Sequence, residues 1–211
     1  MATTFEYSKT LAMEGSIFLL LGLIPYVGWA LGIVGVILLL RAMKEFSSFY
    51  QDNGIYQNSL TGVKYYIIAL IALAVSAASF VVGFVFTDFT TVLTVGNTLG
   101  IAIGVVFIIV AFVFYVLAAT HLRKTFNTLA QKTGEHTFET AGTLLWIGSI
   151  LTIIVVGLLL ILIAWIFAIV GFFAMKSPYY SPQSYANNSP PTQPPAQPTQ
   201  TTNHKPTTIH Q

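Results

Sequence analysis

The stretch VGNTLGIAIGVVFIIVAFVFYVLAAT, from Val95 to Thr120, contains no Asp, Glu, Lys, Arg or His. About 20 apolar helical residues cross a bilayer core about 30 Å thick, so this segment is long enough to span a membrane. Three further apolar blocks share its character, at 16–40, 63–86 and 143–175, and Lys64, at the start of the second, is their one charged residue. Backbone amides in lipid must bond within their own segment, and no block alternates like a barrel strand. The chain is therefore predicted to be an all-α, polytopic integral membrane protein with four hydrophobic helical blocks.

The composition agrees with this class and excludes several others. Hydrophobic residues make up 55% of the 211 positions and charged residues only 8%, too few to cover a soluble domain. The lipid bilayer is therefore the expected main partner. The net charge of +2 comes from few, scattered groups, whereas nucleic-acid binding needs a concentrated basic face, so no nucleic acid is expected. The chain has no cysteine, which excludes disulfides and thiolate metal sites.

The positions of the basic residues predict how the chain is oriented in a cell membrane. The segment 87–94 contains Asp88 and no Lys or Arg. Loops 41–62 and 121–142, with their flanks, hold six of the nine basic residues. Cytoplasmic loops carry an excess of Lys and Arg, which places both loops in the cytoplasm and 87–94 outside. The six residues are Arg41, Lys44, Lys64, Arg123, Lys124 and Lys132.

The first and last blocks are either helical hairpins or single kinked helices. Pro25-Tyr26-Val27-Gly28-Trp29 lies near the middle of the first block, where Pro25 and Gly28 predict a helix break. The last block runs 33 residues without a charge, about 50 Å as one helix at 1.5 Å per residue, and a bend is expected at Gly157. If both blocks fold back, Lys9 and Lys176 join the other cations in the cytoplasm, so we favour hairpins. Tilted or kinked single spans are the alternative.

The membrane domain, 1–176, contains a weak internal repeat. A shift of 80 residues aligns six identical pairs, among them Phe46 with Phe126 and Gly54 with Gly134, which suggests halves at about 1–88 and 89–176. The alternative is that two similar loops converged in composition.

Apolar residues at helical spacing follow each block that leads into a basic loop, and they predict helices lying along the membrane surface. These stripes are Met43, Phe46 and Phe49 or Tyr50 in the first loop, and Leu122, Phe126 and Leu129 in the second.

The composition changes abruptly at Ser177. Residues 177–211 are rich in Pro, Thr, Gln, Ser and Asn, with Lys205 as their one charge, and such a segment is predicted to be disordered. It contains two P-x-x-P patterns that favour polyproline II, at 191–194 and 195–198. The tail is therefore either a docking arm for a partner or a solubilising end, and we favour the latter.

Small residues at helical spacing predict close helix packing. Gly96, Gly100 and Gly104 share one face of the third block, and such a face lets another backbone approach closely. Similar faces contain Ser76 and Gly83 in the second block, and Gly28 and Gly32 in the first. They either join helices within one subunit, which we favour, or form a homo-oligomer interface or a pore.

No residue cluster has the pattern of a catalytic, cofactor or metal site. His136 and Glu139 lie three residues apart beside Glu135, but a metal site needs three or four ligands, and we expect a solvated loop. Apart from Lys64 in its first turn, the second block contains no Asp, Glu, Lys, Arg or His, and the third and fourth blocks contain none. Glu14 precedes the first block, where it either meets Lys9 or a partner helix or extends to the headgroups. The chain is therefore expected to have no cofactor and not to be an enzyme.

Several short motifs are similar to an archaeal family of membrane proteins known as domain of unknown function 996. They are Ser8-Lys9-Thr10-Leu11, Gly15-Ser16-Ile17, Gly32-Ile33-Val34-Gly35 with Leu38-Leu39-Leu40, Phe49-Tyr50-Gln51-Asp52 with Ile55-Tyr56-Gln57-Asn58-Ser59-Leu60, and Ile163-Ala164-Trp165-Ile166. The resemblance covers about residues 5–176, and Arg41 to Lys44 depart from the family's apolar ending. It implies an archaeal cell membrane and no catalytic residues.

Two functional hypotheses follow. The first is a non-catalytic scaffold or subunit of a membrane assembly, with another membrane protein or a second copy as partner. The second is a small channel or transporter that uses the break at Pro25 to Gly28 and the glycine face of the third block. A membrane-embedded enzyme ranks third.

Overall fold

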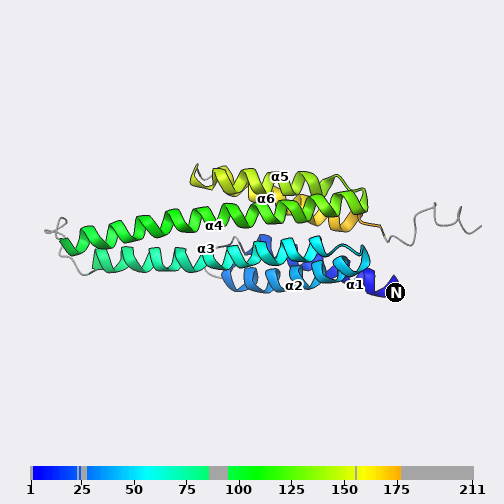
Figure 1. Cartoon of the computed structure of the whole chain (residues 1–211), viewed down its shortest axis with the longest axis horizontal. Coiled ribbons are helices and arrows are strands. Elements are labelled where there is room, and N and C mark those ends of the chain that lie inside the picture. The colour runs from blue at the N-terminus through cyan, green and yellow to red at the C-terminus, as the bar shows by residue number, and fades with distance from the viewer. Residues whose placement is uncertain (1, 23, 25–27, 86–94, 155, 177–211) are drawn as a thin grey trace, which may run out of the picture. The chain divides into compact units, whose positions relative to one another are not determined.

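The computed structural model describes residues 2–22, 24, 28–85, 95–154 and 156–176, and no strand occurs among them. Four described helical segments are long and apolar enough to cross a membrane: Asn53–Gly83, Thr98–Thr133, Thr137–Ile154 and Val156–Ala174. The predicted all-α membrane fold is therefore confirmed. The helices are α1 (Ala2–Leu21), α2 (Gly28–Phe49), α3 (Asn53–Val85), α4 (Val95–Thr133), α5 (Thr137–Leu151), the short 3₁₀ helix η1 (Thr152–Ile154) and α6 (Val156–Ala174) (Figure 1).

The first apolar block is divided between α1 and α2, which pack against each other as a hairpin. Glycines allow this contact. A Cβ on Gly15 would stand 2.8 Å from the Leu39 amide nitrogen, and one on Gly35 would stand 2.8 Å from the Gly15 carbonyl oxygen. Neither α1 nor α2 is among the four candidate spans in the described part of the chain. The hairpin favoured from the sequence is therefore confirmed for this block, and the single kinked span is not what the structure shows.

The last apolar block also folds back, with α5 and α6 packed against each other. The helix is interrupted at η1, and α6 begins at Val156, so the break precedes the expected bend at Gly157. Gly157 lies in the first turn of α6, against the backbone of Gly148 and Thr152. One uncharged block therefore supplies two of the four candidate spans.

α3 and α4 form the longest hairpin, about 50 and 58 Å at 1.5 Å per residue. Contacts at two points along the helices define their antiparallel register. A Cβ on Gly62 would be 3.2 Å from the Ala118 carbonyl oxygen, and the Ser76 hydroxyl donates to the Gly104 carbonyl at 2.9 Å. Figure 1 shows α5 and α6 alongside only part of α4, so one part of the α3–α4 hairpin extends beyond them.

The two basic segments, 41–62 and 121–142, are mostly helical, which confirms the expectation that their apolar stripes extend the helices. α2 continues to Phe49 and α3 begins at Asn53, while α4 continues to Thr133 and α5 begins at Thr137. Each remaining link is three residues long. The chain reverses there through left-handed backbone at Gln51, with φ of 50°, and at Gly134, with φ of 74°.

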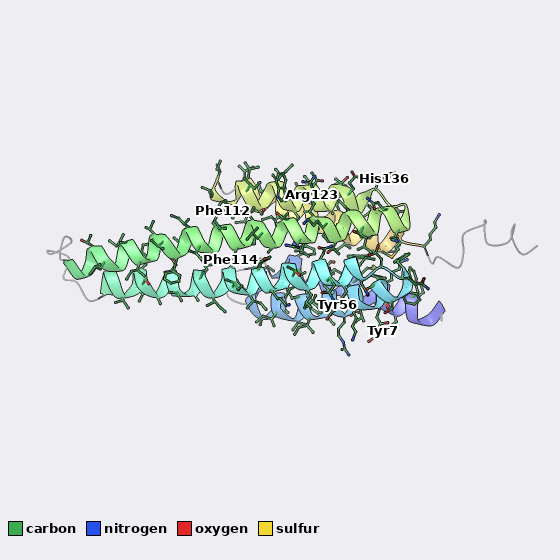
Figure 2. The ribbon with its side chains drawn as sticks, in the orientation of Figure 1. Tyr7, Tyr56, Phe112, Phe114, Arg123 and His136 are labelled. Carbon is green, nitrogen blue, oxygen red and sulfur yellow. The ribbon has the colours of Figure 1, made fainter. Side chains whose placement is uncertain are left out.

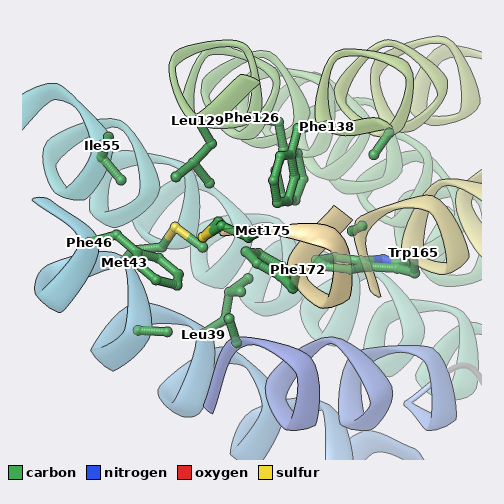
Figure 3. Packing of buried hydrophobic residues seen from close by; sticks show 14 of the residues in the cluster. Leu39, Met43, Phe46, Ile55, Phe126, Leu129, Phe138, Trp165, Phe172 and Met175 are labelled. Carbon is green, nitrogen blue, oxygen red and sulfur yellow. The ribbon is translucent and has the colours of Figure 1, made fainter. Parts of the chain in front are cut away.

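The apolar stripes beside these links face inward, so the prediction that they lie along the membrane surface is wrong. They form the centre of a buried cluster with the C-terminal half of α6 (Figure 3). Phe172 has no exposed surface, and its ring lies 6.1 Å from Phe46, 6.4 Å from Phe126 and 4.9 Å from Phe138. This one side chain joins α6 to α2, α4 and α5.

The structure leaves the internal repeat as a prediction. Phe46 and Phe126, paired by the 80-residue shift, are both buried and both contact Phe172. The other predicted pair behaves differently, since Gly54 lies in the first turn of α3 and Gly134 lies in a link.

Candidate functional site

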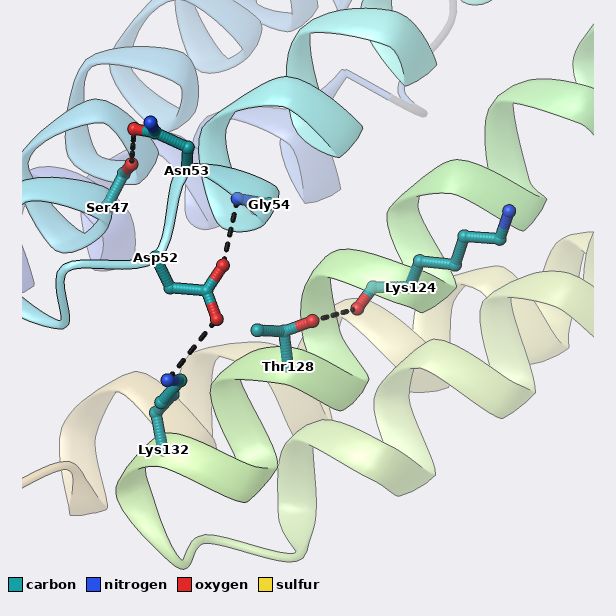
Figure 4. Close-up of polar contacts among 7 residues, drawn as sticks. All are labelled: Ser47, Asp52, Asn53, Gly54, Lys124, Thr128 and Lys132. Carbon is teal, nitrogen blue, oxygen red and sulfur yellow. Dashed lines mark hydrogen bonds and ion pairs between the residues drawn. The ribbon is translucent and has the colours of Figure 1, made fainter.

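Polar contacts at one end of the helices join the first link to the end of α4, and α1 to the residue that follows α6. Lys132 in α4 pairs with Asp52 at 3.3 Å, and the other oxygen of Asp52 accepts a bond from the Gly54 amide at 2.9 Å (Figure 4). Lys9 in α1 donates to the Met175 carbonyl at 3.0 Å. The hairpins therefore bring the start of α1, both links and the end of α6 to the same end of the domain.

The predicted small face of α4 lies against the predicted small face of α3. A Cβ on Gly100 would be 3.2 Å from the Ser79 carbonyl oxygen and 3.3 Å from the Gly83 Cα. Gly104 accepts the Ser76 hydrogen bond and faces the Phe80 ring, and Gly96 lies two turns before Gly104 on α4. These contacts lie within one chain, and they fill the space between the two helices.

The glycines of the first block lie at the closed end of the α1–α2 hairpin. A Cβ on Gly28 would be 2.5 Å from the Gly22 carbonyl oxygen, whereas the nearest atom to one on Gly32 is the Gly22 Cα at 3.9 Å. Gly28 is the first residue of α2, and its amide donates to the Ile24 carbonyl at 2.9 Å. Pro25, the other predicted breaking residue, lies outside the described residues.

The titratable residues considered from the sequence lie at the surface. The His136 side chain is 93% exposed (Figure 2). Its Nδ1 lies 3.8 Å from a Glu139 carboxylate oxygen. Glu14 is also exposed. Among the described residues no group of three His, Cys, Asp or Glu side chains could hold a metal ion. His136 and Glu139 therefore form at most a solvent-screened pair when the imidazole is protonated.

Tyr50, in the first link, has an unusual environment. Its hydroxyl is buried without a hydrogen-bond partner among the described residues, and its ring packs against the aromatic cluster. Burial raises the pKa of the Tyr50 phenol to about 12. The hydroxyl therefore stays protonated at neutral pH and contributes packing rather than acid–base chemistry.

A feature of α6 was not predicted from the sequence. Its outward side carries a row of exposed apolar residues, which we call the outer row: Val156, Leu159, Ile163, Ile166, Val170 and Phe173. Its inward side carries a second row that is buried: Gly157, Ile161, Ala164, Ala168 and Gly171. Each row repeats at alternating intervals of three and four residues. The spacing of the two rows was the one signal in the sequence that could have indicated them. Nearly every residue of α6 is apolar, so no polar face distinguishes the outer row from the buried row.

Comparison with known proteins places the chain in a family. An uncharacterized protein of Methanocaldococcus jannaschii is 28% identical over 162 residues, which cover 76% of this chain and 89% of that protein. No solved structure matches the chain. The family model of DUF996, a protein family of unknown function, matches residues 31–166, which is more than half of the sequence. The chain belongs to the DUF996 family, as the sequence motifs indicated.

Proposed function

We propose that this chain is a non-catalytic scaffold or subunit of a membrane assembly. The main support is the way its helices use their small residues. Ser79 and Gly83 of α3 pack against the glycine face of α4, and the Ser76 hydroxyl donates its hydrogen bond to the Gly104 carbonyl. The buried polar residues among those described are all Ser or Thr: Ser8, Ser16, Ser47, Ser59, Ser76, Thr125 and Ser149. Such an interior suits rigid packing better than proton or ion transfer, which typically uses buried ionisable groups.

The same proposal orients the domain with its basic end in the cytoplasm. Exposed Arg41, Lys44, Lys64 and Lys124 surround the end of the domain that also holds Lys9 and Lys132. Cytoplasmic segments near membrane spans are enriched in such residues. Under this orientation the outer end of the α3–α4 hairpin faces away from the cytoplasm, and the Pro-rich tail, 177–211, follows a cytoplasmic helix end.

A channel or transporter is the second candidate, because the first block is broken near Gly28. Two observations weigh against it. Gly28 is in direct backbone contact with Gly22, and a shallow hollow on α4 is lined only by apolar side chains: Ala102, Ile103, Val106 and Phe107. A path for ions needs polar or charged lining groups.

Flux measurements separate the two candidates. The purified chain is reconstituted in liposomes, and the permeation of K⁺, Cl⁻ and H⁺ is followed with ion-sensitive dyes. A scaffold gives rates equal to those of protein-free liposomes. A rate well above that level, and changed by Gly104→Ala at the glycine face, refutes the scaffold proposal.

A further inference from the structure

The outer row of α6 has the spacing of a helix-pairing seam. Its residues are between 40% exposed, at Ile163, and 71% exposed, at Phe173. They recur at intervals of three, four, three, four and three, which is the pattern of apolar a and d positions in left-handed helix pairs. The opposite row already packs inside the chain. One helix thus carries two such rows, one partnered within the chain and one on its surface.

Ring contacts on the inward side of α6 establish which part of α4 is level with the second half of this row. Trp165 and Phe172 lie 6.3 and 6.4 Å from the Phe126 ring, so the C-terminal half of α6 is beside that residue. Arg123 and Lys124 lie within one turn of Phe126 on the same helix. Phe173, the last residue of the outer row, has the Lys9 ammonium group 5.8 Å from its ring. The second half of the row is therefore at the height of charged residues.

The hydrocarbon core of the bilayer cannot cover both this half of the row and the α3–α4 hairpin. A core of about 30 Å takes about 20 residues of helix. On α3 the residues between exposed Lys64 and Val85 form an uncharged segment of this length. On α4, which pairs with α3, no residue from Val95 to Thr120 is charged. If the hydrocarbon core were instead positioned along the helices so that it covered Phe173, then Lys64 and Lys124 would lie in lipid. Charged side chains near the bilayer centre are strongly destabilised, so the core does not take this position.

We propose that the outer row of α6 pairs with the outer row of a second copy of this chain. Two copies inserted in the same direction meet through a two-fold axis along the membrane normal, so each residue of the row faces its own counterpart. Beyond the hydrocarbon core the alternative to pairing is water, so the hydrophobic effect drives the contact there. Six side chains with about 100 Å² exposed each give about 600 Å² per copy and about 1,200 Å² for the pair, the lower bound of stable interfaces.

This inference rests on the proposed scaffold function and names its partner as the chain itself. Since the chain has no cysteine, single cysteines report contacts unambiguously. Ile166→Cys and Val170→Cys are placed in the row, and Ile37→Cys, on an exposed position of α2, is the matched control. Oxidation in native membranes is expected to give a covalent species of twice the 23.0 kDa chain mass for the two row variants only. Equal cross-linking of Ile37→Cys, or none at the row positions, overturns the proposal.

A second variant tests the interface without a cross-link. Val170→Asp places a charge in the second half of the outer row, and light scattering in mild detergent is expected to show the mass of one chain instead of two. Tyr7→Asp, an equally drastic change at an exposed residue of α1, is expected to leave the dimer intact. Retained helical circular dichroism in both variants excludes unfolding. A Val170→Asp dimer that persists overturns the proposal.

The two proposals fail separately. Absent cross-links together with liposomes that show no flux refute the α6 seam and leave the scaffold proposal standing. Flux above the protein-free level refutes the scaffold proposal, whatever the cross-linking result.

Discussion

Two glycines one turn apart in α2 are predicted to respond oppositely to the same substitution. A methyl group on Gly28 would stand 2.5 Å from the Gly22 carbonyl oxygen and 2.8 Å from that of Leu21. Both atoms belong to the backbone, so relief requires separating α1 from α2, and such overpacking costs about 1–3 kcal/mol. A methyl group on Gly32 meets only the Gly22 Cα, at 3.9 Å. Alanine there gains about 0.5–1 kcal/mol, because glycine in a helix loses more backbone entropy on folding.

The assay is unfolding of Gly28→Ala, Gly32→Ala and the unsubstituted chain in mixed detergent micelles, followed by helical circular dichroism. The expected difference between the two variants is about 1.5–4 kcal/mol in the free energy of unfolding, the sum of the two effects. Equal stability of the variants, or a lower stability of Gly32→Ala, would refute the close approach of α1 and α2 on which the first hairpin depends.

Three other substitutions test the remaining parts of the domain. Phe172→Ala removes the ring shared by α2, α4, α5 and α6 and should lower the free energy of unfolding by about 3–5 kcal/mol, whereas Tyr7→Ala, an exposed control, should change it by less than about 0.5 kcal/mol. Tyr50→Phe removes a buried hydroxyl that has no hydrogen-bond partner among the described residues, and it should leave the free energy of unfolding unchanged or raise it by about 1 kcal/mol. A decrease in the free energy of unfolding of more than about 1 kcal/mol would show that the hydroxyl has a partner. The raised pKa of Tyr50 means that the folded state favours the protonated phenol. Its contribution to the free energy of unfolding is therefore complete below pH 10 and is lost as the pH rises toward 12. Tyr50→Phe should remove this part of the loss of stability at alkaline pH. Lys132→Ala breaks a partly exposed ion pair with Asp52 and should cost at most about 1 kcal/mol in the same assay; a larger loss would indicate that the pair is shielded from solvent.

The sequence was sufficient to predict the helical membrane class, because apolar blocks of this length are typical of helices that cross a bilayer. It also indicated that the first and last blocks are broken. It failed at the links, since a stripe such as Met43 and Phe46 has the same spacing in a surface helix as in a buried one, and only the partner helix decides between them. Phe172, the partner in this case, lies more than 120 residues away along the chain.

The candidate surfaces were predictable to different degrees. The spacing of Gly100 and Gly104 indicated a close helix contact, but not whether α3 or a second copy would occupy it. The outer row of α6 was hidden for a different reason. A helix that is apolar on all sides gives no contrast between faces, so Ile166 and its buried neighbour Trp165 look alike until the fold places them.

The central claim is that both broken blocks turn back, so that all the basic ends lie on one side of the membrane. Single cysteines at Gln51, Lys176 and Thr90 test it in intact cells with a membrane-impermeant thiol reagent. Gln51 marks one link, Lys176 follows α6, and Thr90 lies in the sequence between α3 and α4. We expect Gln51→Cys and Lys176→Cys to be protected and Thr90→Cys to be labelled. Labelling of Lys176→Cys together with Thr90→Cys would mean that the last block crosses once, and it would contradict the α5–α6 hairpin.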